Sequence, residues 1–188
     1  MRWLVPPVRW RADGSSLSLV AAGGTDWFVD PSGERDPALN GAALVGDAAG
    51  DYLFSARVRV GFEATFDAGV LMLHAGDRTW AKLCFEYSPA NEAMVVSVVT
   101  RGTSDDANGF VVDGDEVWLR IARLGAAFAF HASNDGREWT LVRHFTLGED
   151  VEPALGFEAQ SPTGTGCEVT FDEIRFEPVR LGDLRDGS

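Results

Sequence analysis

An alternation of apolar and polar residues, repeated along almost the whole chain, constrains the fold more than any other feature of this sequence. Clusters of Gly, Asp, Asn and Pro interrupt it about every ten residues. Because successive side chains on a strand point to opposite faces, each alternating segment predicts a strand with one buried face. These segments are 16–22, 52–62, 69–75, 80–87, 93–101, 116–124, 127–133, 139–145, 152–160 and 168–176.

We therefore predict an all-β fold in which two antiparallel sheets pack face to face. Apolar residues at helical spacing are nearly absent. Ten or more strands fit a jelly-roll sandwich better than an immunoglobulin domain of about 100 residues. The alternation changes phase between Phe171 and Ile174, which predicts a bulge at Asp172 or Glu173. We expect residues 1–177 to form a single domain and residues 178–188, which lose the alternation, to be a loose tail.

Charge and cysteine content restrict the partners and the compartment. The chain has 29 acidic and 16 basic residues, a net charge of −13, which opposes binding to nucleic acid or to an anionic membrane surface. Cys84 and Cys167 are the two cysteines, and we expect both to be reduced thiols. The start, MRWLVPPVRW, lacks the apolar core of a signal peptide. We expect a cytoplasmic protein, and exposed sheet edges would allow a homodimer.

The segment FDAGVLMLHAGDRTWAKLCFEY, residues 66–87, contains the most informative strand. Ala81, Leu83 and Phe85 form a plain core face there. The opposite face carries Trp80, Lys82, Cys84 and Glu86. A solvent-facing sheet surface accounts for a Lys and a Glu, but it has no need of a large Trp. This face is therefore a candidate binding surface.

The order of several motifs resembles a known family. They are GGTDWF (23–28), DYLFSARVRV (51–60), FDAGVLML (66–73), WAKLCFE (80–86), VSVVTRGTSDD (96–106), SNDGREW (133–139) and GFEAQSPTGTGCEVTF (156–171). The resemblance is to the domain of unknown function 1349 family (regulation-of-enolase-like), in the concanavalin A-like lectin/glucanase superfamily. It spans roughly residues 10–176 and implies a jelly roll with a concave face, without implying a particular reaction. TDWF departs from the family pattern, where Phe more often precedes Trp.

An aromatic side chain flanked by acids, amides and hydroxyls is the chemistry that recognises sugars. We predict that a carbohydrate or a similar polyhydroxylated metabolite binds on the concave sheet, with Trp80 stacked on it. Carboxylates would accept hydrogen bonds from its hydroxyls, and Lys82 would donate one or orient Glu86. The predicted ligand-binding residues are Asp26, Trp27, Asp67, Trp80, Lys82, Glu86, Thr100, Ser104 and Asp105. The histidines lack metal spacing, so we expect no metal and no cofactor.

Two other functions remain open from the sequence. The first is an enzyme that acts on a glycoside or a sugar acid, with Glu86 as acid or base and Lys82 tuning its pKa. Hydrolysis needs a second carboxyl group, which Asp67 or Glu158 could supply from a neighbouring strand. The second is a protein-interaction module, which predicts a flat apolar patch on the same face.

Overall fold

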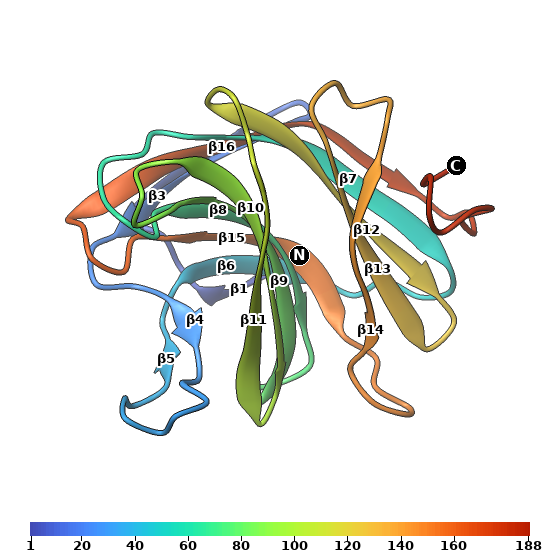
Figure 1. Ribbon diagram of the computed structural model, residues 1–188, viewed down its shortest axis with the longest axis horizontal. Helices are drawn as coiled ribbons and strands as arrows, with labels where there is room; N and C mark the ends of the chain where they lie inside the picture. Colours follow the sequence, from blue (N-terminus) through green and yellow to red (C-terminus); the bar gives the residue numbers. More distant parts are fainter.

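The computed structural model describes residues 1–188 as a sandwich of two seven-stranded antiparallel sheets with no helix (Figure 1). Sheet A has the order β1 (Arg2–Val5), β6 (Ala42–Gly46), β15 (Ala154–Gln160), β8 (Ala68–His74), β9 (Thr79–Tyr87), β10 (Ala93–Arg101) and β11 (Thr103–Val111). Sheet B has the order β14 (Thr140–Thr146), β13 (Ala127–Ser133), β12 (Glu116–Leu124), β7 (Tyr52–Val60), β16 (Gly166–Glu177), β3 (Ser16–Ala22) and β2 (Arg9–Asp13). Two short strands, β4 (Trp27–Phe28) and β5 (Ala38–Leu39), pair separately. The predicted all-β sandwich is confirmed.

The main core lies between the two sheets and follows the alternation of the sequence. Ala81, Leu83 and Phe85 of β9 belong to a buried cluster of 29 residues drawn from both sheets. In β7 every second residue is buried from Tyr52 to Val60. Burial of one face of each sheet against the other thus accounts for the period of two seen in the sequence.

The predicted bulge in the last strand is confirmed. The pairing of β16 with β7 shifts register between Asp172 and Arg175, and Glu173 has a positive φ of 48°. Asp172 accepts hydrogen bonds from Arg57 Nε and Arg59 Nη1, both at 2.8 Å. The bulge therefore changes the phase of the strand while its first residue stays in an ion-pair network on the outer face of sheet B.

The outer face of sheet A carries a second apolar cluster, which the segment containing β4 and β5 covers. Trp27 and Val29 of this segment pack with Val70, Met72 and Trp80 of the sheet. In Figure 1, β4 and β5 lie beside sheet A on the side away from β7 and β12. We name residues 24–41 the cover segment.

The C-terminal residues 178–188 are not the loose tail that we expected. Leu181 is buried against Ala122 and Ala129 on the outer face of sheet B. Arg120 Nη2 donates a hydrogen bond of 2.7 Å to the carbonyl of Gly187. The ring of His131, whose pKa burial lowers to about 4, bonds through Nε2 to the carbonyl of Leu184 at 2.9 Å.

The segment lost its alternation because it contributes single anchoring residues rather than a strand. The structure contains no helix long and apolar enough to cross a membrane.

Candidate functional site

The candidate site lies on the outer face of sheet A, where β9 carries Lys82. Lys82 is 2% exposed. Its Nζ donates hydrogen bonds to Asp26 Oδ1 at 2.9 Å and to Gln160 Oε1 at 2.8 Å, and it lies 5.7 Å from the centre of the Trp80 ring. Burial alone would lower the pKa of Lys82, but the carboxylate of Asp26 and its other acidic neighbours outweigh this and raise it. The ammonium is therefore charged, and these bonds use two of its three protons.

Glu158 is a fully buried carboxyl group on β15, next to this lysine. Its strand neighbours are Ala43 and Val70. Neither carboxyl oxygen has a hydrogen-bond partner. Burial raises the pKa of Glu158 to about 8, although the ammonium of Lys82 acts to lower it. A Cβ on Gly41 of the cover segment would collide with this carboxyl group, so the cover segment lies directly against it.

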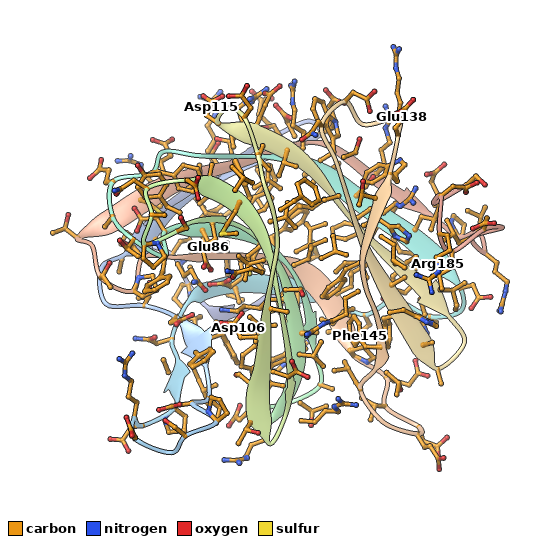
Figure 2. The ribbon with its side chains drawn as sticks, in the orientation of Figure 1. Glu86, Asp106, Asp115, Glu138, Phe145 and Arg185 are labelled. Carbon is orange, nitrogen blue, oxygen red and sulfur yellow. The ribbon has the colours of Figure 1, made fainter.

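Glu86 and Asp106 form the more open side of the site. Glu86 of β9 lies opposite Ala68, which has Gln160 on its other side. Burial raises the pKa of Glu86 to about 8. Asp106 of β11 lies opposite Val98 of β10, which lies opposite Lys82 on its other side. Asp106 is in contact with solvent, but the protein around it removes part of its hydration, and this raises its pKa. Figure 2 labels both residues on the side of sheet A that faces the cover segment.

We call this group the Lys82 cluster; it consists of Asp26, Lys82, Glu86, Asp106, Glu158 and Gln160. It places one ammonium among four carboxyl groups that come from four different segments. Asp26 and Gln160 are engaged by Lys82, whereas no chain donor bonds the carboxyl oxygens of Glu158. Such a cluster can give hydrogen bonds to hydroxyl groups and accept hydrogen bonds from them.

Of the predicted ligand-binding residues, three belong to the Lys82 cluster: Asp26, Lys82 and Glu86. Trp80 is not the accessible stacking surface that we expected, because it is 0% exposed beneath the cover segment. Trp27 is 3% exposed rather than at a rim, and its ring meets that of Trp80 edge to face at 6.0 Å. Its Nε1 donates to the carbonyl of Gly41 at 2.9 Å. The two indoles therefore hold the cover segment on the sheet.

The hydroxyl groups of Thr100 and Ser104 are engaged with each other and with the cover segment. They are buried and lie 2.9 Å from each other. Ser104 Oγ accepts a hydrogen bond from the backbone N–H of Val29 at 2.9 Å, and its own N–H donates to the Val29 carbonyl. This pairing fixes one end of the cover segment to β11.

Asp67 and Asp105 have partners of their own. Asp67 is fully buried, and it accepts hydrogen bonds from the N–H groups of Glu63 and Ala64, both at 2.9 Å. Its other oxygen accepts from Ser161 Oγ at 2.6 Å. Asp105 pairs with Arg143 of β14 at 3.0 Å, on the opposite face of β11 from Asp106. The two carboxylates therefore lie outside the Lys82 cluster, and each is engaged by groups of the chain.

Three members of the cluster were absent from the predicted set. Glu158 and Gln160 are two residues apart on one strand, so the alternation already placed them on one face; Glu158 entered only as a partner for Glu86. Asp106 was not predicted because residues 103–111 form a strand in which the polar residues SDDAN run without alternation. Once that strand is recognised, the period of two separates Asp106 from Asp105.

Two hollows of the surface lie away from the Lys82 cluster. One of about 440 Å³ is lined by Phe110, Ser133 and Asp135 among others, and one of about 470 Å³ by Arg9, Trp10 and Glu168 among others. Neither contains a buried carboxyl group without a partner. The Lys82 cluster is partly covered, but it contains the one buried carboxyl group whose two oxygens both lack a partner, which favours it as the functional site.

Comparison with known proteins identifies relatives of this fold. The sequence model described as "Protein of unknown function (DUF1349)" matches residues 3–179. A protein of unknown function from Saccharomyces cerevisiae is 25% identical, with a TM-score of 0.86 over 95% of this chain and 96% of that one. The carbohydrate binding module CBM66 from Bacillus subtilis is 12% identical, with a TM-score of 0.59 over 93% and 94%. No curated protein matches the sequence.

Glycoside hydrolases of family GH43 contain a similar sandwich as one part of a longer chain. BlXynB from Bacillus licheniformis is 14% identical, with a TM-score of 0.68. The similarity covers 87% of this chain but 33% of the enzyme. The chain thus spans about a third of the length of that hydrolase, and the likeness is one of fold.

Proposed function

We propose that this chain, which belongs to the DUF1349 family, binds a carbohydrate or a similar hydroxyl-rich ligand at the Lys82 cluster. The observation that carries the proposal is the carboxyl group of Glu158, which is fully buried beside a charged lysine without a hydrogen-bond partner. A buried polar group left unpaired costs about 1–3 kcal/mol. Such a group calls for an explanation, and hydrogen bonds to a bound ligand supply one.

A pair of neighbouring hydroxyl groups is a natural partner for this arrangement. One hydroxyl can accept a hydrogen bond from the third N–H of the Lys82 ammonium, and the same or the next hydroxyl can form a hydrogen bond with the carboxyl group of Glu158 or Glu86. Each carboxyl group can both donate and accept while it is protonated, which the raised pKa values of Glu86 and Glu158 favour near neutral pH. The combination suits a polyol better than an apolar ligand.

The ligand would approach from the side of Glu86 and Asp106, where the cluster meets solvent. Glu158 lies deeper, against Gly41, so a ligand reaches it only when the cover segment moves. The link from Asp26 to Lys82 joins that segment to the sheet. Binding therefore includes a small outward shift of the cover segment in this proposal.

The comparisons support a carbohydrate rather than another class of polyol. CBM66 is a carbohydrate-binding module with this sandwich over nearly its full length, and the GH43 enzymes are glycoside hydrolases that contain it. Both likenesses are of fold, so the argument for a ligand site in this chain depends on its own residues.

Thermal-shift measurements with neutral, amino and acidic mono- and oligosaccharides test the proposal. A ligand at 100 times its Kd adds about 2.7 kcal/mol to the free energy of unfolding, or roughly 5–10 °C for a chain of this size. Asp106→Asn is the test variant and Asp105→Asn the matched control, because these neighbours lie on opposite faces of β11. We expect the shift to fall in the first and to persist in the second. Equal thermal shifts in both variants would show that the ligand binds outside the Lys82 cluster.

A second candidate is a glycoside-acting enzyme that uses Glu86. The raised pKa of about 8 keeps Glu86 protonated at neutral pH while it stays partly open to solvent, as a general acid requires. Release of nitrophenol from nitrophenyl glycosides by the wild type, lost in Glu86→Gln, would establish this activity. Sugar binding by the wild type without turnover would exclude it for those glycosides.

A further inference from the structure

We infer that the hydroxyl-rich ligand of the Lys82 cluster also carries a cationic nitrogen, as an amino sugar does. This inference rests on the proposed function and specifies the class of ligand. Its basis is the imbalance of the cluster, in which four carboxyl groups on four segments surround one ammonium. The buried carboxyl group of Glu158 has no hydrogen-bond donor on either oxygen.

The ammonium of Lys82 is already hydrogen-bonded within the chain, and the guanidinium of Arg143, which also acts on Asp106, pairs with Asp105. Lys82 bonds to Asp26 and Gln160, which leaves Glu86, Asp106 and Glu158 without a cation bonded to them. The charged and titratable groups that act on Glu158 are Lys82, Asp26 and Glu86, and those that act on Glu86 are Lys82, Asp106 and Asp26. Cys84, on the same face of β9, stays a neutral thiol because burial raises its pKa. A ligand ammonium beside these carboxyl groups would stabilise their ionised forms through charge-assisted hydrogen bonds.

The surroundings are suited to an ammonium group. The one ammonium that the chain provides lies 5.7 Å from the centre of the Trp80 ring and within hydrogen-bond reach of a carboxylate and an amide oxygen. A ligand cation would use the carboxyl groups of the cluster, because the buried ring of Trp80 already faces Lys82. The net charge of −13 on the chain adds a long-range attraction for cations and a repulsion for anions.

The same electrostatic interactions predict different affinities for ligands that share one sugar ring but differ in charge. A protonated amine gains charge-assisted hydrogen bonds from carboxylates, whereas its N-acetyl derivative cannot, so we expect at least about tenfold tighter binding of the amine. A sugar acid would bring a further negative charge among the carboxyl groups and should bind more weakly than the neutral sugar.

Binding of a cationic ligand should also change the number of protons bound to the cluster. At pH 6.5 the pKa values of about 8 keep Glu86 and Glu158 largely protonated. An ammonium placed beside them favours their ionised forms, so its binding releases protons to the buffer. A neutral sugar leaves their protonation nearly unchanged.

Isothermal titration calorimetry at pH 6.5 tests this inference in two buffers of different ionisation enthalpy. The ligands are glucosamine, N-acetylglucosamine, glucose, glucuronate and cyclohexylamine, which has the amine without hydroxyl groups. We expect glucosamine to bind at least tenfold more tightly than the others and to release protons. Glu158→Gln and Asp106→Asn should remove most of that preference, and the matched control Asp105→Asn should keep it. Asp106 is exposed, so this variant tests the inference even where Glu158→Gln fails to fold.

The other outcomes separate this inference from the proposed function. Binding of glucose or glucuronate as tightly as glucosamine, without proton release, would overturn the cationic ligand and leave sugar binding in place. Binding of cyclohexylamine as tightly as glucosamine would overturn the requirement for hydroxyl groups. Absence of binding by every sugar, checked also against oligosaccharides and their amino derivatives, would overturn both.

Discussion

Replacement of Glu158 by Gln should change how the stability of this protein depends on pH. The folded state raises the pKa of Glu158 from 4.5 to about 8. Between these values the unfolded chain has lost the proton and the folded chain keeps it, so stability falls as pH rises. At about 1.36 kcal/mol per pH unit the loss amounts to about 5 kcal/mol. It is absent below pH 4.5 and complete above about pH 8.

Gln has nearly the same shape as protonated Glu but cannot ionise. At pH 4.5 we therefore expect the variant and the wild type to have similar free energies of unfolding. By pH 9 the variant should be more stable by several kcal/mol, a large share of the 5–15 kcal/mol typical of a domain. Groups far from Glu158 titrate alike in both proteins, so the difference between the two curves reports on Glu158 and the groups coupled to it.

Urea denaturation followed by tryptophan fluorescence, repeated from pH 4.5 to 9, measures this difference. Asp105→Asn serves as a control, because it removes an exposed carboxylate on the other face of β11, outside the Lys82 cluster. Parallel curves for Glu158→Gln would show that the carboxyl group is not held neutral by burial. The electrostatic argument for the Lys82 cluster would then fail.

Three further substitutions test the packing around the site and the ion pairs of sheet B. Trp80→Ala should cost about 3–5 kcal/mol, measured by urea denaturation, because Trp80 is fully buried; a cost below 1 kcal/mol would mean that the cover segment is not seated on it. Gly156→Ala should destabilise by several kcal/mol, since its Cβ would overlap the carbonyl oxygen of Leu44, whereas Gly61→Ala meets only an ordinary contact at 3.6 Å; equal thermal midpoints would contradict this. Asp172, whose pKa its hydrogen bonds to arginine lower, stabilises the fold above its unfolded value of 3.8, and this contribution is lost as pH falls through its lower folded pKa. Asp172→Asn should therefore be less stable than the wild type at pH 7 and equally stable once the wild-type carboxylate is protonated, as thermal melts at pH 7 and pH 2 would reveal.

The sequence by itself determined the architecture, because the alternation that encodes it is local. Each segment with a period of two became a strand, and Leu83 and Phe85 lie in the main core as their spacing predicted. The change of phase after Phe171 became a bulge for the same reason. The face shared by Lys82 and Glu86 was also readable, since the side-chain direction along one strand needs no knowledge of distant residues.

Only the tertiary structure decided what lies over that face. Asp26 contacts Lys82 across 56 positions of sequence, and Gln160 contacts it across 78. The cover segment contains only two short strands, so its sequence has no periodic pattern that predicts the burial of Trp80. Burial then changed the chemistry: an indole expected at the surface became a packing residue, and a carboxyl group without a partner came to lie beside the lysine. Periodicity fixes the direction of a side chain, but its exposure and pKa depend on segments that long-range packing brings over it.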